Sequence, residues 1–260
     1  MSAGLPYRLG APAGAAARLG LIVLRTDETI EHEFRRLFAD LDVALFVTRI
    51  PMQAEVTPET LTAMEAALPA AAGLLPDAAP FDAVGYACTS GATLIGPDRV
   101  SALLRRSVDV RMVTDPLSAA LAAFAALRVS RVALISPYVA SVAAPLRAAF
   151  EAGGVAVPVS RSFGLAEEAA VARIDPDSVL EAALAAGRGP DVEAVFLSCT
   201  NLRTLEAIPK AEARLGKPVL SSNLALAWAL ARAGGQGKPG QEGPRTGLHV
   251  GIGAFLDRPQ

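Results

Sequence analysis

The sequence is poor in the residues that build many metal and recognition sites. It contains two cysteines and two histidines, and aromatic residues make up 5% of the chain. Because no CxxC motif and no histidine cluster is present, no metal site is expected. The formal net charge of −2 leaves no basic stripe, and the aromatic residues are too few for base stacking. Nucleic acid is therefore not expected as a partner.

Long hydrophobic runs are missing as well. Hydrophobic residues make up 52% of the chain, but no apolar run approaches the roughly 20 residues that span a bilayer, so no membrane partner is expected. Residues 1–17 are rich in Ala, Gly and Pro and lack an apolar centre behind a basic start. We interpret them as a flexible tail and not as a signal peptide. Two unpaired cysteines without a secretory signal favour a cytoplasmic protein.

Apolar runs typical of buried strands alternate with helical patterns. Leu19–Leu24 is a continuous apolar run, as expected for a strand covered on both faces of a parallel sheet. Strands are expected at 19–24, 43–47, 81–87, 110–113, 131–136, 155–159, 192–197 and 218–220. Helices are expected at 30–38, 57–68 (breaking near Pro69 or Gly73), from 97, at 116–127, 142–150, 175–184, 202–215 and 224–233, with a loop and a short helical piece at 162–173. This alternation predicts the α/β class with right-handed crossovers.

The order of these elements repeats, which predicts two pseudosymmetric lobes. Each lobe would hold a roughly four-stranded parallel sheet flanked by helices. The expected divisions are a tail (1–17), an N-terminal α/β lobe (18–118), a C-terminal α/β lobe (119–222), a final helix packing back toward the N-terminal lobe (223–234), and a loop or tail (235–260), in which 249–256 could add an edge strand. Since ligands bind beyond the carboxyl ends of such strands, the active site is expected in the interlobe cleft.

The two cysteines follow equivalent strands of the two halves. Cys88 and Cys199 are each followed by a threonine and another small polar residue. We expect both thiols to face one cleft, each at a helix start whose backbone N–H groups lower the thiol pKa. The residues after them are candidates for binding a substrate carboxylate, namely Thr89, Ser90, Thr200 and Asn201.

Two facing thiols can move a proton across a carbon atom. One thiolate removes a proton from one face and the other thiol returns a proton to the opposite face, without a metal or an organic cofactor. Alternatively, one thiolate could add covalently to an activated double bond. Each cysteine could also be a small buried hydrophobic residue, and a disulfide is not expected in the cytoplasm.

Four linked motifs resemble the Asp/Glu racemase superfamily, in its maleate isomerase and arylmalonate decarboxylase branch. They are Gly85–Gly91, Ser136–Tyr138, Ser198–Arg203, and Gly216–Asn223 with Ala225–Trp228. The resemblance runs from Leu19 to Gly234 and implies two α/β lobes, a cofactor-independent enzyme and a homodimer. Decarboxylases of this branch generally keep only the second cysteine, so the presence of both implies a racemase or isomerase.

Two departures from the family pattern bear on the substrate. Asp27 stands where maleate isomerases have a carboxylate-binding asparagine, and Glu168 or Glu167 stands near a second family asparagine. An acid repels a dicarboxylate and attracts an ammonium group, so an amino acid or a derivative of one is expected. The turn that begins at Thr26 also resembles the racemase-like protein of ectoine-utilisation gene clusters, which implies a substrate such as 2,4-diaminobutyrate or its N-acetyl form. Both acids could instead cap helices.

These observations predict a cofactor-independent racemase or isomerase acting next to the carboxylate of a small amino acid or derivative. Cys88 and Cys199 would be catalytic, and the resemblance implies that the Tyr138 hydroxyl contacts the substrate. The full expected set of substrate-binding residues is Asp27, Thr89, Ser90, Tyr138, Glu168, Thr200 and Asn201. Maleate cis–trans isomerase, arylmalonate-type decarboxylase and a non-catalytic small-molecule binding protein remain as alternatives. Asn223 is expected to cap or brace the last helix, outside the site.

Overall fold

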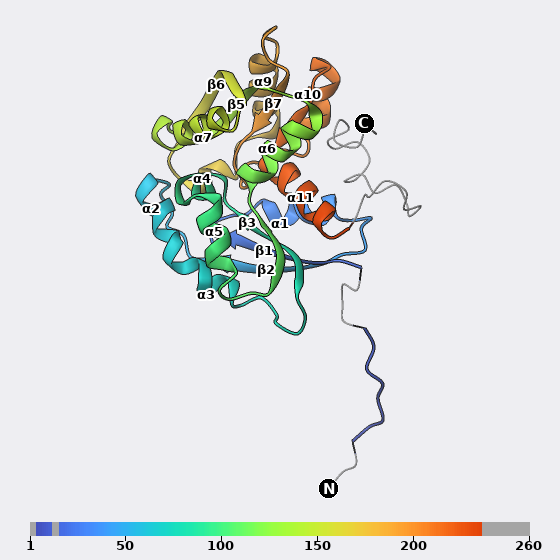
Figure 1. Cartoon of the computed structure of the whole chain (residues 1–260). Coiled ribbons are helices and arrows are strands. Elements are labelled where there is room, and N and C mark those ends of the chain that lie inside the picture. The colour runs from blue at the N-terminus through green and yellow to red at the C-terminus, as the bar shows by residue number, and fades with distance from the viewer. Residues whose placement is uncertain (1–3, 12–15, 236–260) are drawn as a thin grey trace.

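The computed structural model describes residues 4–11 and 16–235 and contains two parallel four-stranded sheets (Figure 1). The first has the order β2-β1-β3-β4, and the second has the equivalent order β6-β5-β7-β8. The strands are β1 (Arg18–Leu24), β2 (Ala44–Ile50), β3 (Phe81–Ala87), β4 (Val110–Thr114), β5 (Arg131–Tyr138), β6 (Ala156–Leu165), β7 (Ala194–Leu197) and β8 (Val219–Ser221). The predicted α/β class, with a repeated four-stranded parallel sheet, is confirmed.

Helices connect the strands and cover the sheets. They are α1 (Ile30–Leu37), α2 (Pro58–Ala63), α3 (Leu68–Ala72), α4 (Thr89–Ile95), α5 (Pro97–Leu104), α6 (Pro116–Leu127), α7 (Ala140–Ala152), α8 (Glu168–Val171), α9 (Pro176–Gly187), α10 (Ala207–Leu215) and α11 (Ser222–Ala233), with a 3-10 helix at Met64–Ala67. In Figure 1, α1 and α11 lie between the two sheets. Among the described residues, no helix combines the length and apolar character needed to cross a membrane.

Capping side chains explain where several helices begin. Thr57 and Thr60 form a reciprocal capping box at the start of α2. The Asp115 carboxylate accepts hydrogen bonds from the first N–H groups of α6, and the Ser221 hydroxyl accepts one from Leu224 in α11. These side chains satisfy N–H groups that lack a partner within the helix, which confirms the helix starts expected from the sequence.

Three elements differ most from those expected. β6 continues to Leu165, because β5 continues to Tyr138 and pairs with it there. The helix expected over 57–68 gives way to the 3-10 turn before Pro69, which lacks the N–H that a continuous α-helix would use. The helix expected to begin at residue 202 begins at Ala207, and the N–H groups of Thr204 and Leu205 in the preceding loop donate to Glu33.

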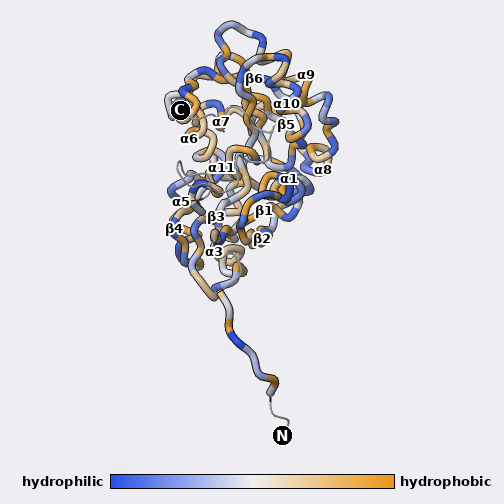
Figure 2. Tube along the Cα trace, turned by 90° about the vertical axis from the view of Figure 1, so that its right-hand side faces the viewer, coloured by the Kyte–Doolittle hydropathy of each residue, from blue (hydrophilic) through white to orange (hydrophobic). Residues whose placement is uncertain are grey.

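The hydrophobic core includes Leu19 and Leu21–Leu24 of β1 and the inner faces of the helices. Every residue of β1 is buried, and Figure 2 shows hydrophobic and hydrophilic segments alternating along the chain, with hydrophobic segments beside β1. α11 packs on β3 because Gly85 has no side chain: a Cβ there would lie 3.2 Å from Leu230 Cδ1 and 3.3 Å from Leu226 Cδ1. The last helix therefore contacts the first sheet, although it follows the second sheet in the chain.

The ends of the chain are described only in part. Residues 4–11 have no regular secondary structure and are exposed. The strand considered for 249–256, and all of the expected tail beyond residue 235, lie outside the described residues. The exact division into lobes stays a prediction.

A buried acid joins α1 to the C-terminal part of the chain. Glu33 is 3% exposed, and its Oε1 accepts hydrogen bonds from the N–H groups of Thr204 (2.8 Å) and Leu205 (3.2 Å). Its Oε2 accepts one from Asn223 Nδ2 (2.7 Å). Burial raises the pKa of Glu33 to about 7, although these hydrogen bonds favour the charged form. One carboxyl group thus holds together three parts of the fold.

This raised pKa should make the stability depend on pH. Between the ordinary glutamate value of 4.5 and about 7, the folded state binds a proton that the unfolded state has released. The free energy of unfolding should therefore fall as pH rises through this window, by about 3 kcal/mol at most from this group. Glu33→Gln should show a smaller fall than the wild type in urea unfolding midpoints between about pH 4.5 and 8. The exposed-acid control Glu181→Gln should keep the wild-type dependence; equal pH dependence in Glu33→Gln and wild type would contradict the prediction.

Candidate active site

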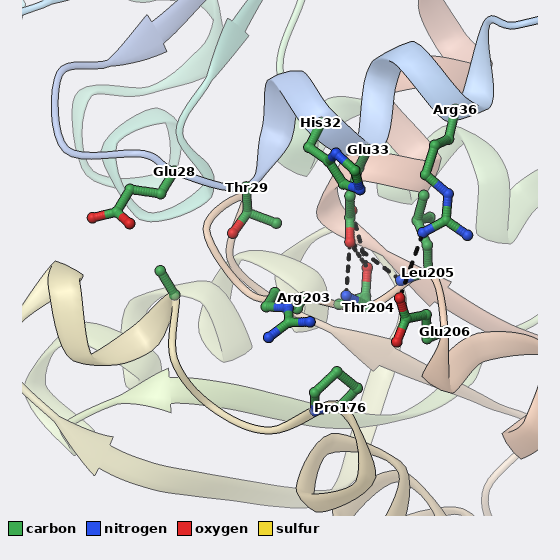
Figure 3. Close-up of a pocket in the computed structure, with 11 residues that line it drawn as sticks. Glu28, Thr29, His32, Glu33, Arg36, Pro176, Arg203, Thr204, Leu205 and Glu206 are labelled. Atoms are coloured by element: carbon green, nitrogen blue, oxygen red, sulfur yellow. Dashed lines mark hydrogen bonds and ion pairs between the residues drawn. The ribbon is translucent and has the colours of Figure 1, made fainter.

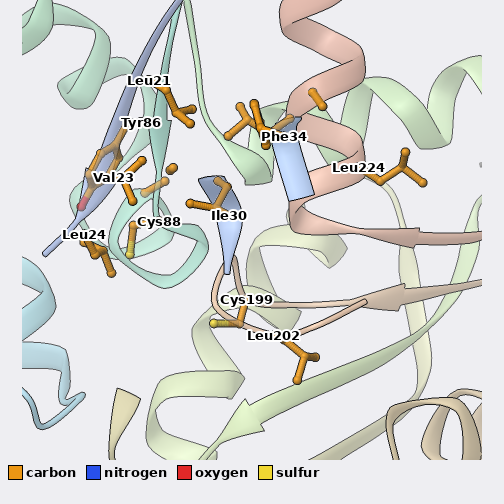
Figure 4. Packing of buried hydrophobic residues seen from close by; sticks show 14 of the residues in the cluster. Leu21, Val23, Leu24, Ile30, Phe34, Tyr86, Cys88, Cys199, Leu202 and Leu224 are labelled. Atoms are coloured by element: carbon orange, nitrogen blue, oxygen red, sulfur yellow. The ribbon is translucent and has the colours of Figure 1, made fainter. Parts of the chain in front are cut away.

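Cys88 and Cys199 follow the carboxyl ends of β3 and β7, which hold equivalent places in the two sheets. Each is 4% exposed, and Figure 4 shows both thiols within one buried cluster that also contains Ile30 of α1. The packing of the two sheets thus brings together two residues that are far apart in the sequence.

Hydrogen bonds tie the two cysteine loops to each other. The Thr200 hydroxyl donates to the carbonyl oxygen of Ala87, the residue before Cys88 (3.3 Å). The Ser222 Oγ accepts a hydrogen bond from the N–H of Cys199 (3.0 Å) and lies 2.7 Å from the Thr89 Oγ1. The relative positions of the two thiols are therefore set by these polar links as well as by apolar packing.

Cys88 is the N-terminal cap of α4, and its Sγ accepts a hydrogen bond from the N–H of Gly91 (3.2 Å). A Cβ at Gly91 would lie 2.9 Å from this Sγ and 2.6 Å from the Tyr86 hydroxyl, so the turn requires glycine. The sequence patterns did not reveal α4, because Gly91 and the β-branched residues within it are weak helix formers. The expected helix start after Cys88 is nevertheless present.

Cys199 lies in a loop and not at a helix start. Its φ of 98° falls in a region that favours glycine, and such strained residues concentrate at functional sites. Its Sγ accepts a hydrogen bond from the N–H of Asn201 (3.3 Å), while the next helix begins only at Ala207. The expectation of two matching helix starts is therefore wrong for the second cysteine.

Tyr138 stands between Cys199 and an acid. Its hydroxyl donates to Glu168 Oε1 (2.6 Å) and lies 3.0 Å from Cys199 Sγ. The other oxygen of Glu168 accepts a hydrogen bond from Asn201 Nδ2 (2.9 Å). Glu167 is exposed, so Glu168 is the one of the two candidate glutamates that lies in the cluster.

The Asn201 side chain connects the two halves of the site. Its Oδ1 accepts a hydrogen bond from the N–H of Glu28 (2.8 Å), and its Nδ2 donates to the carbonyl oxygen of Glu168 (3.1 Å) as well as to the carboxyl group. The amide therefore joins the turn after β1 to α8. With these partners, Asn201 orients the Glu168 carboxyl group, in addition to the contact with a ligand expected from the sequence.

Asp27 both caps a helix and leaves one oxygen unpaired. Its Oδ1 accepts hydrogen bonds from the N–H groups of Thr29 and Ile30 (both 2.8 Å), which is the capping role considered from the sequence. Its Oδ2 is buried without a hydrogen-bond partner. Burial raises the pKa of this carboxyl group; the nearby Thr200 hydroxyl opposes that shift, but it donates its hydrogen bond to the carbonyl oxygen of Ala87. Leaving such an oxygen unpaired costs about 1–3 kcal/mol, so this corner of the site is suited to a ligand that donates hydrogen bonds.

Burial dominates the protonation of the cluster. It raises the pKa of Cys88 to about 12 and that of Cys199 well above its usual value, and the carboxyl groups of Glu168 and Asp27 add to both shifts. Burial also raises the pKa values of Asp27 and Glu168 themselves. The expected lowering of the thiol pKa values is therefore wrong for this structure, because desolvation outweighs the N–H groups at each sulfur. Both thiols are neutral in this closed arrangement.

All nine residues predicted for the site are buried, and most of them are joined by the hydrogen bonds described above. The sequence reasoning missed Ser222 and Glu33. Ser222 lies within a motif that carried the family resemblance, so the motif was a signal. Glu33 had no comparable signal, because its partners are remote in sequence and two of them are backbone N–H groups. Asn223 braces α11 against Glu33 and the carbonyl oxygen of Thr200, as expected.

A pocket of about 160 Å³ lies next to this cluster (Figure 3). It opens between α1 and residues 203–206, with Pro176 on its opposite wall, and it is also lined by Glu28 and Thr29. The Thr29 hydroxyl donates to the carbonyl oxygen of Asn201 (2.9 Å), so one turn borders both the pocket and the cluster. Neither cysteine lines the pocket. In the described part of the chain, no three His, Cys, Asp or Glu side chains are grouped to hold a metal ion.

Sequence comparisons place the chain near two kinds of enzyme. The arylmalonate decarboxylase of Bordetella bronchiseptica is 40% identical over 132 residues, which are 50% of this chain and 55% of that protein. The maleate isomerase of Nocardia farcinica is 29% identical over 227 residues, covering 83% of this chain and 89% of that protein. The first match therefore spans about half of its relative, and the second spans most of it.

Solved structures show the same fold. A Nocardia farcinica maleate cis–trans isomerase variant with a covalently bound succinylcysteine intermediate has a TM-score of 0.80 at 27% identity, covering 94% of this chain and 99% of that one. A liganded arylmalonate decarboxylase variant has a TM-score of 0.77 at 27% identity, covering 92% and 98%. The family model described as arylmalonate decarboxylase matches residues 19–243. The resemblance seen in the motifs is confirmed: the chain belongs to the arylmalonate decarboxylase family, in the maleate isomerase and arylmalonate decarboxylase branch of the Asp/Glu racemase superfamily.

Proposed function

We propose that the protein is a cofactor-independent racemase or isomerase that acts at the carbon next to the carboxylate of a small amino acid or derivative. Cys88 and Cys199 are its acid and base. The observation that carries this proposal is the unpaired, buried Asp27 Oδ2 in a cluster whose two acids, Asp27 and Glu168, act electrostatically on both thiols. The homodimer and the cytoplasmic location expected from the sequence stay predictions.

The reaction uses one thiol on each side of the substrate carbon. One cysteine, as thiolate, takes the proton from the carbon next to the carboxylate, and the electron pair left behind is delocalised into that carboxylate. The other cysteine then gives its proton to the opposite face and becomes the thiolate. Both thiols are neutral while the site is closed, so the negative charge must form as substrate enters and replaces water and protein neighbours.

The acid at Asp27 selects the substrate. An ammonium group would donate to Oδ2 and remove the penalty of an unpaired buried acceptor. A second carboxylate in the same place would be repelled by a charged Asp27. It could form a hydrogen bond there only if Asp27 were protonated and donated it. This contrast supports an amino acid or a derivative of one as the substrate class. The finer proposal, 2,4-diaminobutyrate or its N-acetyl form in ectoine breakdown, rests on the resemblance of the turn that begins at Thr26.

The substrate carboxylate would lie against the two cysteine turns. Thr89, Ser90, Thr200 and Asn201 are the proposed contacts, and all four are buried. The hydroxyls of Thr89 and Thr200 and the Asn201 amide are bonded to other protein groups in the closed structure. Binding would therefore exchange some of these hydrogen bonds for bonds to the carboxylate.

The second candidate is a maleate-type cis–trans isomerase. It is favoured by the match to the Nocardia farcinica enzyme over most of both chains and by the cysteine adduct seen in a structure of that enzyme. Here one thiolate would add to the double bond, rotation would follow, and elimination would restore the thiolate. The chain is 40% identical to an arylmalonate decarboxylase over half of its length. Decarboxylation of an arylmalonate is therefore tested in the same assays.

Replacement of either cysteine should strongly lower the rate of proton exchange. In D₂O, the wild type should incorporate deuterium at the α-carbon of its substrate, with 2,4-diaminobutyrate and its N-acetyl form assayed first by mass spectrometry. Cys88→Ser and Cys199→Ser should each lower the exchange rate at least on the order of 100-fold, because a serine hydroxyl is a far weaker acid at neutral pH. Folding of each variant would be checked by circular dichroism. Full exchange in both variants would rule out the two-thiol mechanism, whereas no exchange but ligand binding in the wild type would favour the non-catalytic alternative.

Removal of the charge at Asp27 should change the substrate preference. Asp27→Asn keeps an oxygen for the α1 cap but cannot bind an ammonium group as an ion pair, so exchange on a cationic amino acid should fall at least about tenfold. Formation of fumarate from maleate should rise in the same variant, because the repulsion is gone. Asp175→Asn makes the same change at an exposed helix cap and should behave as wild type. Efficient maleate turnover by the wild type, unimproved by Asp27→Asn, would favour the second candidate, and loss of CO₂ from an arylmalonate would favour the decarboxylase.

A further inference from the structure

The two thiols have different surroundings. Cys199 is connected through the Tyr138 hydroxyl to the Glu168 carboxyl group, by contacts of 3.0 and 2.6 Å. Cys88 contacts the N–H of Gly91 and has the Tyr86 hydroxyl nearby, and that hydroxyl donates to the sulfur of Met64 (3.6 Å). Of the two cysteines, Cys199 is thus the one whose hydrogen-bonded chain ends on a carboxyl group.

The position of Glu168 is fixed from both sides of the site. Its N–H donates to the carbonyl oxygen of Ala54 (3.2 Å), and the N–H of Val56 donates to the carbonyl oxygen of Ala166 (2.8 Å). These bonds form a short antiparallel bridge between the segment after β2 and the segment before α8. Asn201 holds the same carboxyl group from the Cys199 loop. The carboxyl group is thus held at hydrogen-bond distance from Tyr138.

We propose that Glu168 is the proton acceptor of Cys199, through the Tyr138 hydroxyl, so that Cys199 is the thiol that becomes the base and Cys88 the thiol that acts as the acid. This assignment rests on the two-thiol function proposed above and adds the direction of proton flow.

The proton balance of the relay is simple. The S–H bond of Cys199 breaks and its proton moves to the Tyr138 oxygen, while the Tyr138 O–H proton moves to Glu168 Oε1. The result is a thiolate at Cys199 and a neutral Glu168, with no net change in charge. Cys199 then takes the substrate proton and Cys88 gives one to the other face. The resulting Cys88 thiolate regains a proton as Glu168 loses one, by exchange through solvent.

Internal transfer avoids gathering negative charge in a dry site. If Cys199 lost its proton to solvent, its thiolate would lie beside a Glu168 carboxylate, with Asp27 also acting on both groups. Arg49 is a cation that acts on this set, through Asp27. Transfer from Cys199 to Glu168 leaves one negative charge on the pair throughout, so the repulsion of two buried charges does not arise. Cys88 is a further ionisable neighbour that feels the same two acids, and the Tyr138 and Tyr86 hydroxyls act on Cys199 and Cys88 respectively.

The pH dependence of Cys199 alkylation tests this relay without any substrate. In Cys88→Ser, the rate of reaction with iodoacetamide should rise as Glu168 ionises and then level off with pH, because Glu168 accepts the proton during attack. Adding Glu168→Gln should restore the dependence of an unassisted thiol, with the rate rising about tenfold per pH unit. Adding Glu167→Gln, the neighbouring exposed acid, should leave the plateau unchanged. An identical pH dependence of Cys199 alkylation in Cys88→Ser with and without Glu168→Gln would overturn the proposal.

Two further measurements separate the relay from a charge effect and from a folding defect. Tyr138→Phe keeps the Glu168 charge and removes the connecting hydroxyl, so it should lose the plateau in the same way; retention of the plateau would overturn the relay. The alkylation rate of Cys88, measured in Cys199→Ser, should rise about tenfold per pH unit with or without Glu168→Gln. Absence of α-proton exchange in the wild type would count against the proposed function alone, since the Cys199 profile can still show the relay.

Discussion

The site depends on the hydrogen bonds that join the carboxyl ends of the two sheets. Thr200 bonds to the carbonyl oxygen of Ala87, and Ser222 links Thr89 to the backbone of Cys199. Without these links, no hydrogen bond described here would join the Cys88 loop to the Cys199 loop. With them, two cysteines from different sheets share one set of neighbouring acids. The contact of α11 with β3 adds an apolar interface to the same junction.

Burial shapes the chemistry of this junction as strongly as its geometry does. Two carboxyl groups and two thiols lie together in a dry cluster, and each has its pKa raised by desolvation. Such a cluster favours neutral groups until a ligand brings compensating hydrogen bonds or charge. Thiols that are 4% exposed are also out of reach of bulk solvent. The turn whose Thr29 hydroxyl donates to the carbonyl oxygen of Asn201 separates this cluster from the pocket of Figure 3.

Membership of the family still leaves several reactions open, and a few side chains separate them. In the proposed reaction, the pair of cysteines provides an acid and a base on opposite sides of one carbon. Glu168, held by Tyr138 and Asn201, gives the two thiols different surroundings. Asp27, with one oxygen unpaired, is the residue proposed to distinguish an ammonium group from a second carboxylate. The substrate class and the direction of proton flow are thus proposals about these acids, set on a framework that the family shares.

The sequence by itself determined the strands, most helix starts and the equivalent positions of Cys88 and Cys199, because these depend on local signals: continuous apolar runs, capping residues before proline, and short motifs. The tertiary structure alone decided the protonation of the thiols, the choice of Glu168 over Glu167, and the loop conformation at Cys199. It also revealed Glu33, whose hydrogen-bond partners lie more than 170 positions away in the chain. Desolvation and long-range hydrogen bonds arise only when distant segments pack together, so no local pattern in the sequence records them.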